Sequence, residues 1–344
     1  MKGHTQPNMG YNGDLKFDDV DGPWQGNDFP NVSVVSVTFQ GALQAFVFLT
    51  HMNIDFDGAP NAYGPPEKEP LDSLDHAGRN TRYYGLVAIR PDETVDIVVP
   101  KQGKQTKLLK ELYNLKLDER FPDSQGRVPV VQQGGQYDGY FISITSRATR
   151  SLAGANQFQQ STYVNSAKVA FGALSGRLAD KGVAFGNYGM AIRHDNGRQA
   201  GFVLMDGGHT SGRDVGAVGE VSYRVFLDVG GTPKTARQSV PNNNFPTTFM
   251  IFPNSRGPKL STLAKADNAA DLPMLIAFGE QAGDADKSGK SGKPLLDEWV
   301  AGGRTGARPR NYRRVLSALR TAGFWPPIGD FPETNDLDQV ARTA

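Results

Sequence analysis

Two acidic residues, Asp206 and Glu220, stand at either end of a glycine-rich stretch, GGHTSGRDVGAVG. The apolar run GFVLM directly before Asp206 predicts a strand that ends at this carboxylate. Two carboxyl groups held across a cleft can hydrolyse a glycosidic bond, because one protonates the leaving oxygen while the other activates water. His209 and Asp214 lie between them and are candidates to contact the same substrate. Spacing alone equally fits a glycine-rich loop without chemistry.

A second acidic pair, Asp55 and Asp57, lies in the segment NIDFDGAPNAYGP. The two residues are two positions apart at the end of a predicted strand, so we expect both carboxylates on one face. Turn chemistry explains Asp-Gly and Ala-Pro steps as well as a site does. As a site, paired carboxylates would bind cationic groups such as those of amino sugars.

A third acidic group begins like a calcium-binding loop, with Asp284 and Asp286 at its first and third positions in DADKSG. Leu295 occupies the twelfth position, where such loops carry a bidentate Glu, so a linker is favoured over calcium. The chain has no Cys, and its five His lack zinc-enzyme spacing. We therefore expect neither a metal nor another cofactor.

The elements around these residues are predicted to be mainly short strands with few helices. The 40 Gly and 22 Pro among 344 residues imply many turns. Two segments, residues 107–117 and 220–230, are predicted as helices, the second closed by Gly230. The Val residues of the second segment also fit a strand. Alternating or continuous apolar patterns predict eight strands, at residues 32–39, 43–51, 83–90, 94–100, 139–146, 188–194, 201–206 and 247–253.

The composition divides the chain into three parts. Residues 1–31 are predicted to be an irregular arm with few core contacts, residues 32–255 a β-rich domain, and residues 256–344 a linker followed by a helical extension. The net charge of +1 argues against nucleic acid as a partner, and no apolar run is long enough for membrane insertion. The first residues lack a secretory h-region, so we expect no classical signal peptide.

Three ordered segments resemble glycoside hydrolase family 75, the fungal-type chitosanases. They are NIDFDGAPNAYGP, then the stretch from GVAFGNYGM to GEVSY, then TTFMIFPNS, together spanning about residues 30–255. Carried over position by position, the resemblance implies Asp206 and Glu220 as catalytic carboxylates. It also implies substrate binding by Asp55, Asp57, Tyr63, His209 and Asp214. The chain differs from the family at Phe56, where fungal members commonly have Cys, and at Met205, where Gly is expected.

The resemblance further implies a six-stranded barrel akin to the double-psi β-barrel, within a mainly β (α+β) chain. It implies cleavage of a β-1,4-linked amino-sugar polymer, chitosan or the peptidoglycan glycan, by an inverting mechanism. We take Glu220 as the acid and Asp206 as the base, although a helix beginning at Glu220 would favour its charged form and reverse the roles.

Two other activities stay open: a non-catalytic glycan-binding module, which the Met205 difference favours, and a lytic transglycosylase. Without a signal peptide, peptidoglycan is favoured as the substrate, with export by a contractile secretion machine or a phage to a target periplasm. Such an antibacterial effector, cytoplasmic before export, would require a secretion adaptor and an immunity protein as partners.

Overall fold

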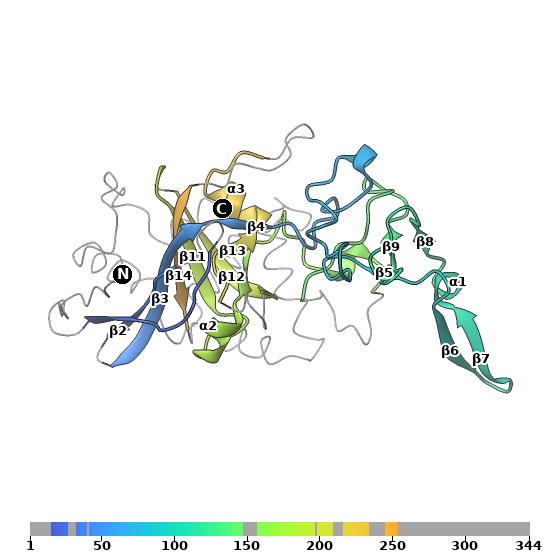
Figure 1. The fold of residues 1–344 in the computed structure, drawn as a ribbon, viewed down its shortest axis with the longest axis horizontal. Helices are drawn as coiled ribbons and strands as arrows, with labels where there is room; N and C mark the ends of the chain where they lie inside the picture. The colour runs from blue at the N-terminus through green and yellow to red at the C-terminus, as the bar shows by residue number, and fades with distance from the viewer. Residues whose placement is uncertain are drawn as a thin grey trace, which may run out of the picture.

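The computed structural model describes residues 15–26, 32–39, 41–146, 157–196, 198–208, 216–233 and 245–253. Within them the chain is mainly β, with only short helices. Figure 1 shows a large sheet on one side of the molecule and smaller sheets on the other. The segment with Asp284 and Asp286, for which a linker is favoured over calcium, and the whole C-terminal extension lie outside the described residues.

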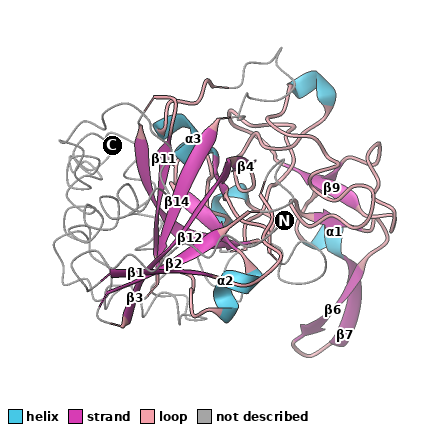
Figure 2. Cartoon of the chain, turned by 60° about the vertical axis from the view of Figure 1, so that its left-hand side comes forward, coloured by secondary structure: helices cyan, strands magenta, loops and turns pink. Residues whose placement is uncertain are grey.

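The large sheet has nine strands in the order β1-β2-β3-β14-β11-β12-β10-β13-β4. Figure 2 shows several of these strands, among them β14, β11 and β12, side by side in the body of the molecule. Most neighbours are antiparallel, but β10 runs parallel to β12, and β13 runs parallel to β4. The strands are β1 (Leu15–Asp19), β2 (Val34–Phe39), β3 (Ala42–His51), β4 (Asn53–Asp55), β10 (Phe171–Leu174), β11 (Tyr188–Arg193), β12 (Gln199–Gly207), β13 (Glu220–Ser222) and β14 (Pro246–Phe252).

Between β4 and β10 the chain builds a side lobe, defined here as residues 56–146. It contains a three-stranded sheet and a two-stranded hairpin, and the hairpin projects away from the body in Figure 1. The three-stranded sheet has β5 (Ala88–Ile89), β8 (Lys116–Leu117) and β9 (Val128–Val131), and the hairpin has β6 (Thr94–Val99) and β7 (Gly103–Leu108). The helical elements among the described residues are η1 (Pro66–Lys68), α1 (Leu109–Leu112), η2 (Gln160–Thr162), α2 (Gly176–Asp180) and α3 (Tyr223–Asp228).

One continuous hydrophobic core joins the large sheet to the side lobe. Phe249 of β14 and Phe226 of α3 share this core with Phe141 and Leu86 of the side lobe. Burial of such aromatic side chains is the main source of folding free energy in a domain of this size. The shared core therefore fixes the position of the side lobe against the sheet, and with it any cavity between them.

The N-terminal region differs from its expected irregular form. Strand β1 pairs antiparallel with β2, with Leu15 opposite Phe39. Trp24 is only 2% exposed, and its indole Nε1 donates to the carbonyl of Val20 at 2.8 Å. For residues 15–26 this corrects the expectation of an irregular arm with few core contacts, because pairing with β2 supplies an order that the polar composition does not reveal.

Both predicted helices are shorter than expected. Residues 107–117 form only the single turn α1, because Lys107 pairs with Val95 in the hairpin and Asn114 adopts the left-handed φ of 51° that ends a helix. Residues 220–230 begin as strand β13 and become the helix α3 only at Tyr223. The predicted closure at Gly230 is confirmed, with its φ at 79°.

Five of the predicted strands are confirmed almost throughout: β2, β3, β6, β11 and β14. The strand before Asp206 is also confirmed, as β12. Of residues 83–90 only Ala88–Ile89 is a strand, and residues 139–146 form isolated bridges such as Leu86 to Ser143. These segments are packed as loops within the side lobe. An alternating apolar pattern occurs in such packed loops as well as in hydrogen-bonded strands, so the sequence does not separate the two.

Among the described strands, the hydrogen-bonded order of the large sheet runs from β1 to β4, and no hydrogen-bonded pair joins these two end strands. No helix in the described part of the chain is long and apolar enough to cross a membrane.

Candidate active site

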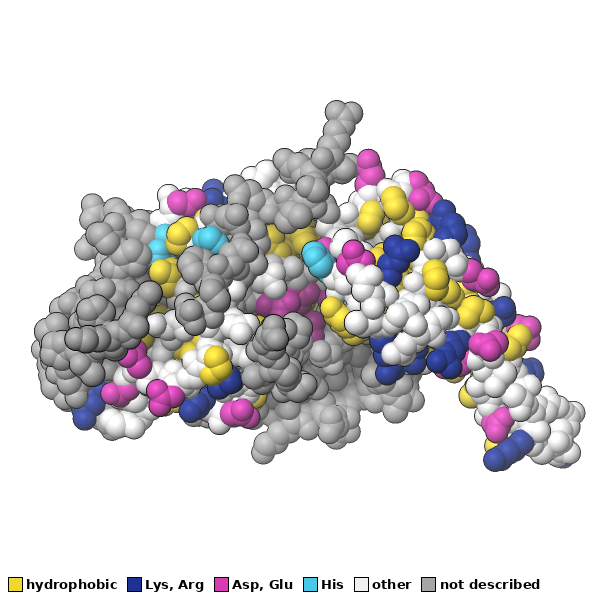
Figure 3. Space-filling view, viewed as in Figure 1, with side chains coloured by type: hydrophobic (Ala, Val, Ile, Leu, Met, Phe, Trp, Pro, Cys, Tyr) yellow, Lys and Arg dark blue, Asp and Glu magenta, His cyan; other side chains and the backbone are white. Residues whose placement is uncertain are grey.

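An acidic cavity of about 900 Å³ lies between the large sheet and the side lobe. Figure 3 shows acidic side chains gathered in a hollow near the middle of the molecule's face. The cavity brings together five of the seven residues predicted for the site, namely Asp55, Asp57, Tyr63, Asp206 and Glu220. The other two, His209 and Asp214, lie outside the described residues.

Asp206 and Glu220 reach this cavity from two strands that flank β10. Asp206, near the end of β12, is opposite Ala173 of β10, just after a register shift at Gly172. On the other side of β10, Val221 of β13 is opposite the same Gly172. Because a register shift bends a strand and re-aims its side chains, it helps to turn this end of β12 toward the cavity. The arrangement places two carboxylates, fourteen positions apart in the chain, across one short strand.

The Asp206 carboxylate is held by two backbone donors. The N–H groups of Ser146 and Gly207 donate to its Oδ1 at 2.8 and 2.7 Å. Hydrogen bonds of this kind favour the charged form of a carboxylate. Asp206 is 6% exposed, so its orientation is set by these bonds and by packing.

Glu220 has a different environment, and its pKa is raised to about 7. The main cause is burial, which disfavours the charged carboxylate, and the negative charge of Asp206 adds to it. Glu220 belongs to the strand β13, which pairs with β4, and α3 begins three residues later. The expected helix dipole is therefore not at Glu220, and the argument for its charged form does not apply.

The acidic pair Asp55 and Asp57 forms a small network with Tyr63. The backbone N–H of Asp57 donates to Asp55 Oδ1 at 2.7 Å, and the Tyr63 hydroxyl donates to Asp57 Oδ1 at 2.5 Å. Burial raises the pKa of both carboxyls well above the usual range, and the charges of Asp206 and Glu220 raise them further. The hydrogen bond from Tyr63 opposes this rise and lowers the pKa of Asp57. Both carboxyls therefore hold a proton more tightly in the folded chain than they would in water.

The cavity is also lined by residues that the sequence patterns did not indicate, and Asp72, His76 and Tyr84 are among them. Asp72 Oδ1 and His76 Nδ1 are 2.7 Å apart. Tyr84 is 60% exposed, the highest exposure among the large aromatic side chains described. All three lie in loops of the side lobe that have no hydrophobic periodicity. Their residue types are therefore the only sequence signal that could have identified them as candidates.

The turn after Asp57 depends on Gly58, which gives a first prediction. Gly58 has a φ of +82°, and a Cβ there would lie 1.8 Å from the Val164 carbonyl oxygen. Gly58→Ala is therefore expected to lower the free energy of unfolding by at least about 2 kcal/mol, measured by urea denaturation. Gly103→Ala is the matched control, because its φ of +79° is similar but no atom lies within 4 Å of the added Cβ. Equal losses in the two variants would contradict the steric argument.

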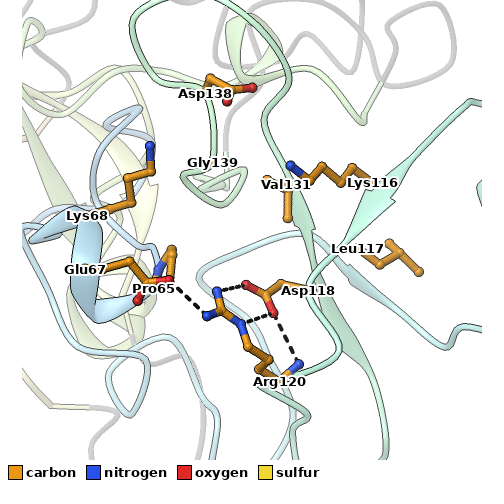
Figure 4. Close-up of a pocket in the computed structure, with 10 residues that line it drawn as sticks. All are labelled: Pro65, Glu67, Lys68, Lys116, Leu117, Asp118, Arg120, Val131, Asp138 and Gly139. Carbon is orange, nitrogen blue, oxygen red and sulfur yellow. Dashed lines mark hydrogen bonds and ion pairs between the residues drawn. The ribbon is translucent and has the colours of Figure 1, made fainter.

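A second cavity, of about 420 Å³, lies in the side lobe (Figure 4). Its Arg120 guanidinium bridges two carboxylates, Asp118 at 2.7 Å and Glu67 at 2.9 Å. All three side chains are at least partly exposed, and the single guanidinium charge offsets part of the charge of the two carboxylates. This cavity therefore contains an exposed network of ion pairs. Its described lining lacks the buried acid and base that acid–base catalysis would need.

Among the residues that the structure describes, no group of His, Cys, Asp or Glu is arranged to hold a metal ion. The acidic cavity instead combines a carboxylate held by backbone donors with a carboxyl whose pKa lies near 7. That combination is able to perform acid–base chemistry. No protein-family model matches the chain, and no curated protein matches it.

Proposed function

We propose that this protein is a glycoside hydrolase that cleaves a β-1,4-linked amino-sugar polymer, chitosan or the peptidoglycan glycan. One observation carries the proposal: Asp206, held by two backbone donors, and Glu220, whose pKa burial raises to about 7, line one cavity. Pairs of carboxyl groups with such divided roles are what glycosidic hydrolysis requires. The chitosanase-like segments of the sequence support the same activity.

In the proposed mechanism Glu220 is the general acid and Asp206 the general base. Glu220 donates its proton to the glycosidic oxygen as the bond from that oxygen to the anomeric carbon breaks. Asp206 accepts a proton from a water molecule whose oxygen attacks the anomeric carbon from the opposite face. The raised pKa of Glu220 supports the acid role, and the two backbone donors to Asp206 support a charged base.

The charge of the cavity supports an amino sugar as the substrate. Its described lining contains five carboxyl groups, those of Asp55, Asp57, Asp72, Asp206 and Glu220, and neither Lys nor Arg. Ammonium groups of glucosamine would offset the repulsion among these carboxylates, whereas the acidic peptides of peptidoglycan would add to it. Deacetylated glucosamine units are therefore the favoured occupants. Delivery as a secreted effector stays a prediction from the sequence.

For the fold we propose a six-stranded barrel of the double-psi type. Its support is the connection of β3 to β4, because only Met52 separates them although they stand at the third and last places of the sheet order. Because β4 directly continues β3 along the chain, the curved sheet brings its last strand next to its third strand. A sheet curved in this way is close to a closed barrel. The two parallel pairs, β10 with β12 and β13 with β4, are also consistent with this mixed barrel.

Product analysis in heavy-oxygen water tests the function. Wild-type protein is incubated with chitosan oligomers or purified peptidoglycan, and the released fragments are weighed by mass spectrometry. Hydrolysis places one heavy oxygen at each new reducing end, and we expect this label from the wild type on chitosan. Early products should carry the inverted, α anomeric configuration, which NMR reports.

Each other outcome of this assay contradicts part of the proposal. Unlabelled anhydro ends would identify a lytic transglycosylase. Binding without any fragments would identify a non-catalytic glycan-binding module. Neither binding nor cleavage of either polymer would overturn the glycan assignment altogether.

A further inference from the structure

Tyr84 is a large aromatic side chain left at the surface of the acidic cavity. It is 60% exposed, whereas its neighbour Tyr83 is 5% exposed. The N–H of Tyr83 donates to Asp123 Oδ2 at 3.1 Å, and its hydroxyl donates to the Phe121 carbonyl at 3.1 Å. These bonds anchor the chain at Tyr83, so the outward position of Tyr84 follows from a well-held backbone.

The ring of Tyr84 is also held in place. Its backbone N–H donates to the Ala77 carbonyl at 2.9 Å. A Cβ at Gly78 would lie 2.6 Å from Tyr84 Cδ1 and 2.8 Å from Cε1, so the ring lies directly against the Gly78 backbone. A rigid aromatic ring loses little conformational freedom when a ligand binds to it.

Tyr84 faces the same carboxyl groups as the proposed reaction. Partial burial raises its pKa, and the charges of Asp57, Glu220 and Asp72 raise it further, in that order. All four residues line the acidic cavity. A ligand seated on the ring would therefore have carboxylates within its reach.

We propose that Tyr84 is a substrate-binding residue whose ring stacks on the apolar face of a glucosamine unit, with the ammonium group of that unit toward Asp57 and Asp72. The inference rests on the proposed function and adds to it an aromatic binding surface. In a β-linked pyranose with equatorial substituents, the C–H groups form apolar faces that match a flat ring. Tyr suits such a contact because its ring is apolar and its hydroxyl stays hydrated.

The first test is steady-state kinetics of Tyr84→Ala on chitosan oligomers. We expect KM to rise roughly three- to tenfold, the range of a lost aromatic contact, with kcat changed much less. Tyr84→Trp should restore the wild-type KM, because it keeps a stacking face. Tyr113→Ala is the matched control, because Tyr113 is 47% exposed but lies outside the described lining of the cavity.

The second test measures binding of a glucosamine hexamer by calorimetry in the Glu220→Gln background, with and without Tyr84→Ala. Affinity should fall by a similar factor when the ring is removed. An unchanged KM and affinity in Tyr84→Ala would overturn this inference while leaving the hydrolase intact. Binding that depends on Tyr84 without cleavage by the wild type would support the inference and contradict the hydrolase. Absence of binding by the wild type would overturn both.

Discussion

Glu220→Gln is expected to lower kcat/KM on the cleaved glycan by about 10²- to 10⁴-fold. The amide cannot deliver a proton to the leaving oxygen, and this step has no other donor in the proposed mechanism. An aryl glycoside with an acidic leaving group needs little protonation, so on such a substrate the loss should be far smaller. Comparing the two substrates therefore tests the acid role itself and not merely the importance of the residue.

The pH profile offers an independent test of the same residue. A general acid acts in its protonated form, and the pKa of Glu220 is about 7. The kcat/KM of the wild type should therefore fall about tenfold for each pH unit above 7, and Glu220→Gln should lack this dependence. A wild-type profile that stays flat between pH 6 and pH 9 would contradict the assignment.

Stability measurements exclude misfolding as the reason for lost activity. The folded pKa of Glu220, about 7, lies above its ordinary value of 4.5, so the folded state binds this proton more tightly than the unfolded state. The contribution of Glu220 to stability is therefore present below pH 4.5 and is lost as pH rises through about 7. At pH 8 Glu220→Gln should unfold at the same or a higher temperature than the wild type, because it removes a buried charge. Glu111→Gln, an exposed change in α1, is the control that should alter neither activity nor stability.

Asp206→Asn is expected to cause a loss of similar size, about 10²- to 10⁴-fold in kcat, for a different reason. The Asn carbonyl oxygen can still accept from the N–H groups of Ser146 and Gly207, so the local structure should persist. The base that activates water is then missing. Since water attack is needed whatever the leaving group, the loss should be equally large on the aryl glycoside.

This contrast separates the roles of the two carboxyls. If Asp206→Asn retained activity on the aryl glycoside while Glu220→Gln lost it, the acid and the base would be exchanged. Asp96→Asn is the matched control, because it makes the same chemical change on the hairpin strand β6, outside the described cavity lining. Thermal unfolding of the two Asn variants verifies that both remain folded.

The mainly β character of the chain, and the strands with strong local patterns, are predictable from the amino-acid sequence alone. Strands β3 and β12 carry apolar runs bounded by turn residues, and such runs predict a strand whatever their neighbours are. Residue type and position also indicated the candidates, with Asp55, Asp57 and Asp206 near predicted strand ends and Glu220 at the start of a predicted helix. Their chemistry is local, so it is visible without a fold.

Which of these residues line the same cavity depends on the tertiary structure. The strands β4, β10 and β13 are three or four residues long and have no pattern of their own, because hydrogen bonds to neighbouring strands define them. Glu220 is in a strand, and not at the expected start of a helix, because β13 pairs with β4 and β10. No helix N-terminus therefore stabilises its charged form, and burial raises its pKa. Tyr84 entered the cavity through loop packing in the side lobe. Burial and charge proximity depend on distant parts of the chain, so the raised pKa of Glu220 arises only on folding.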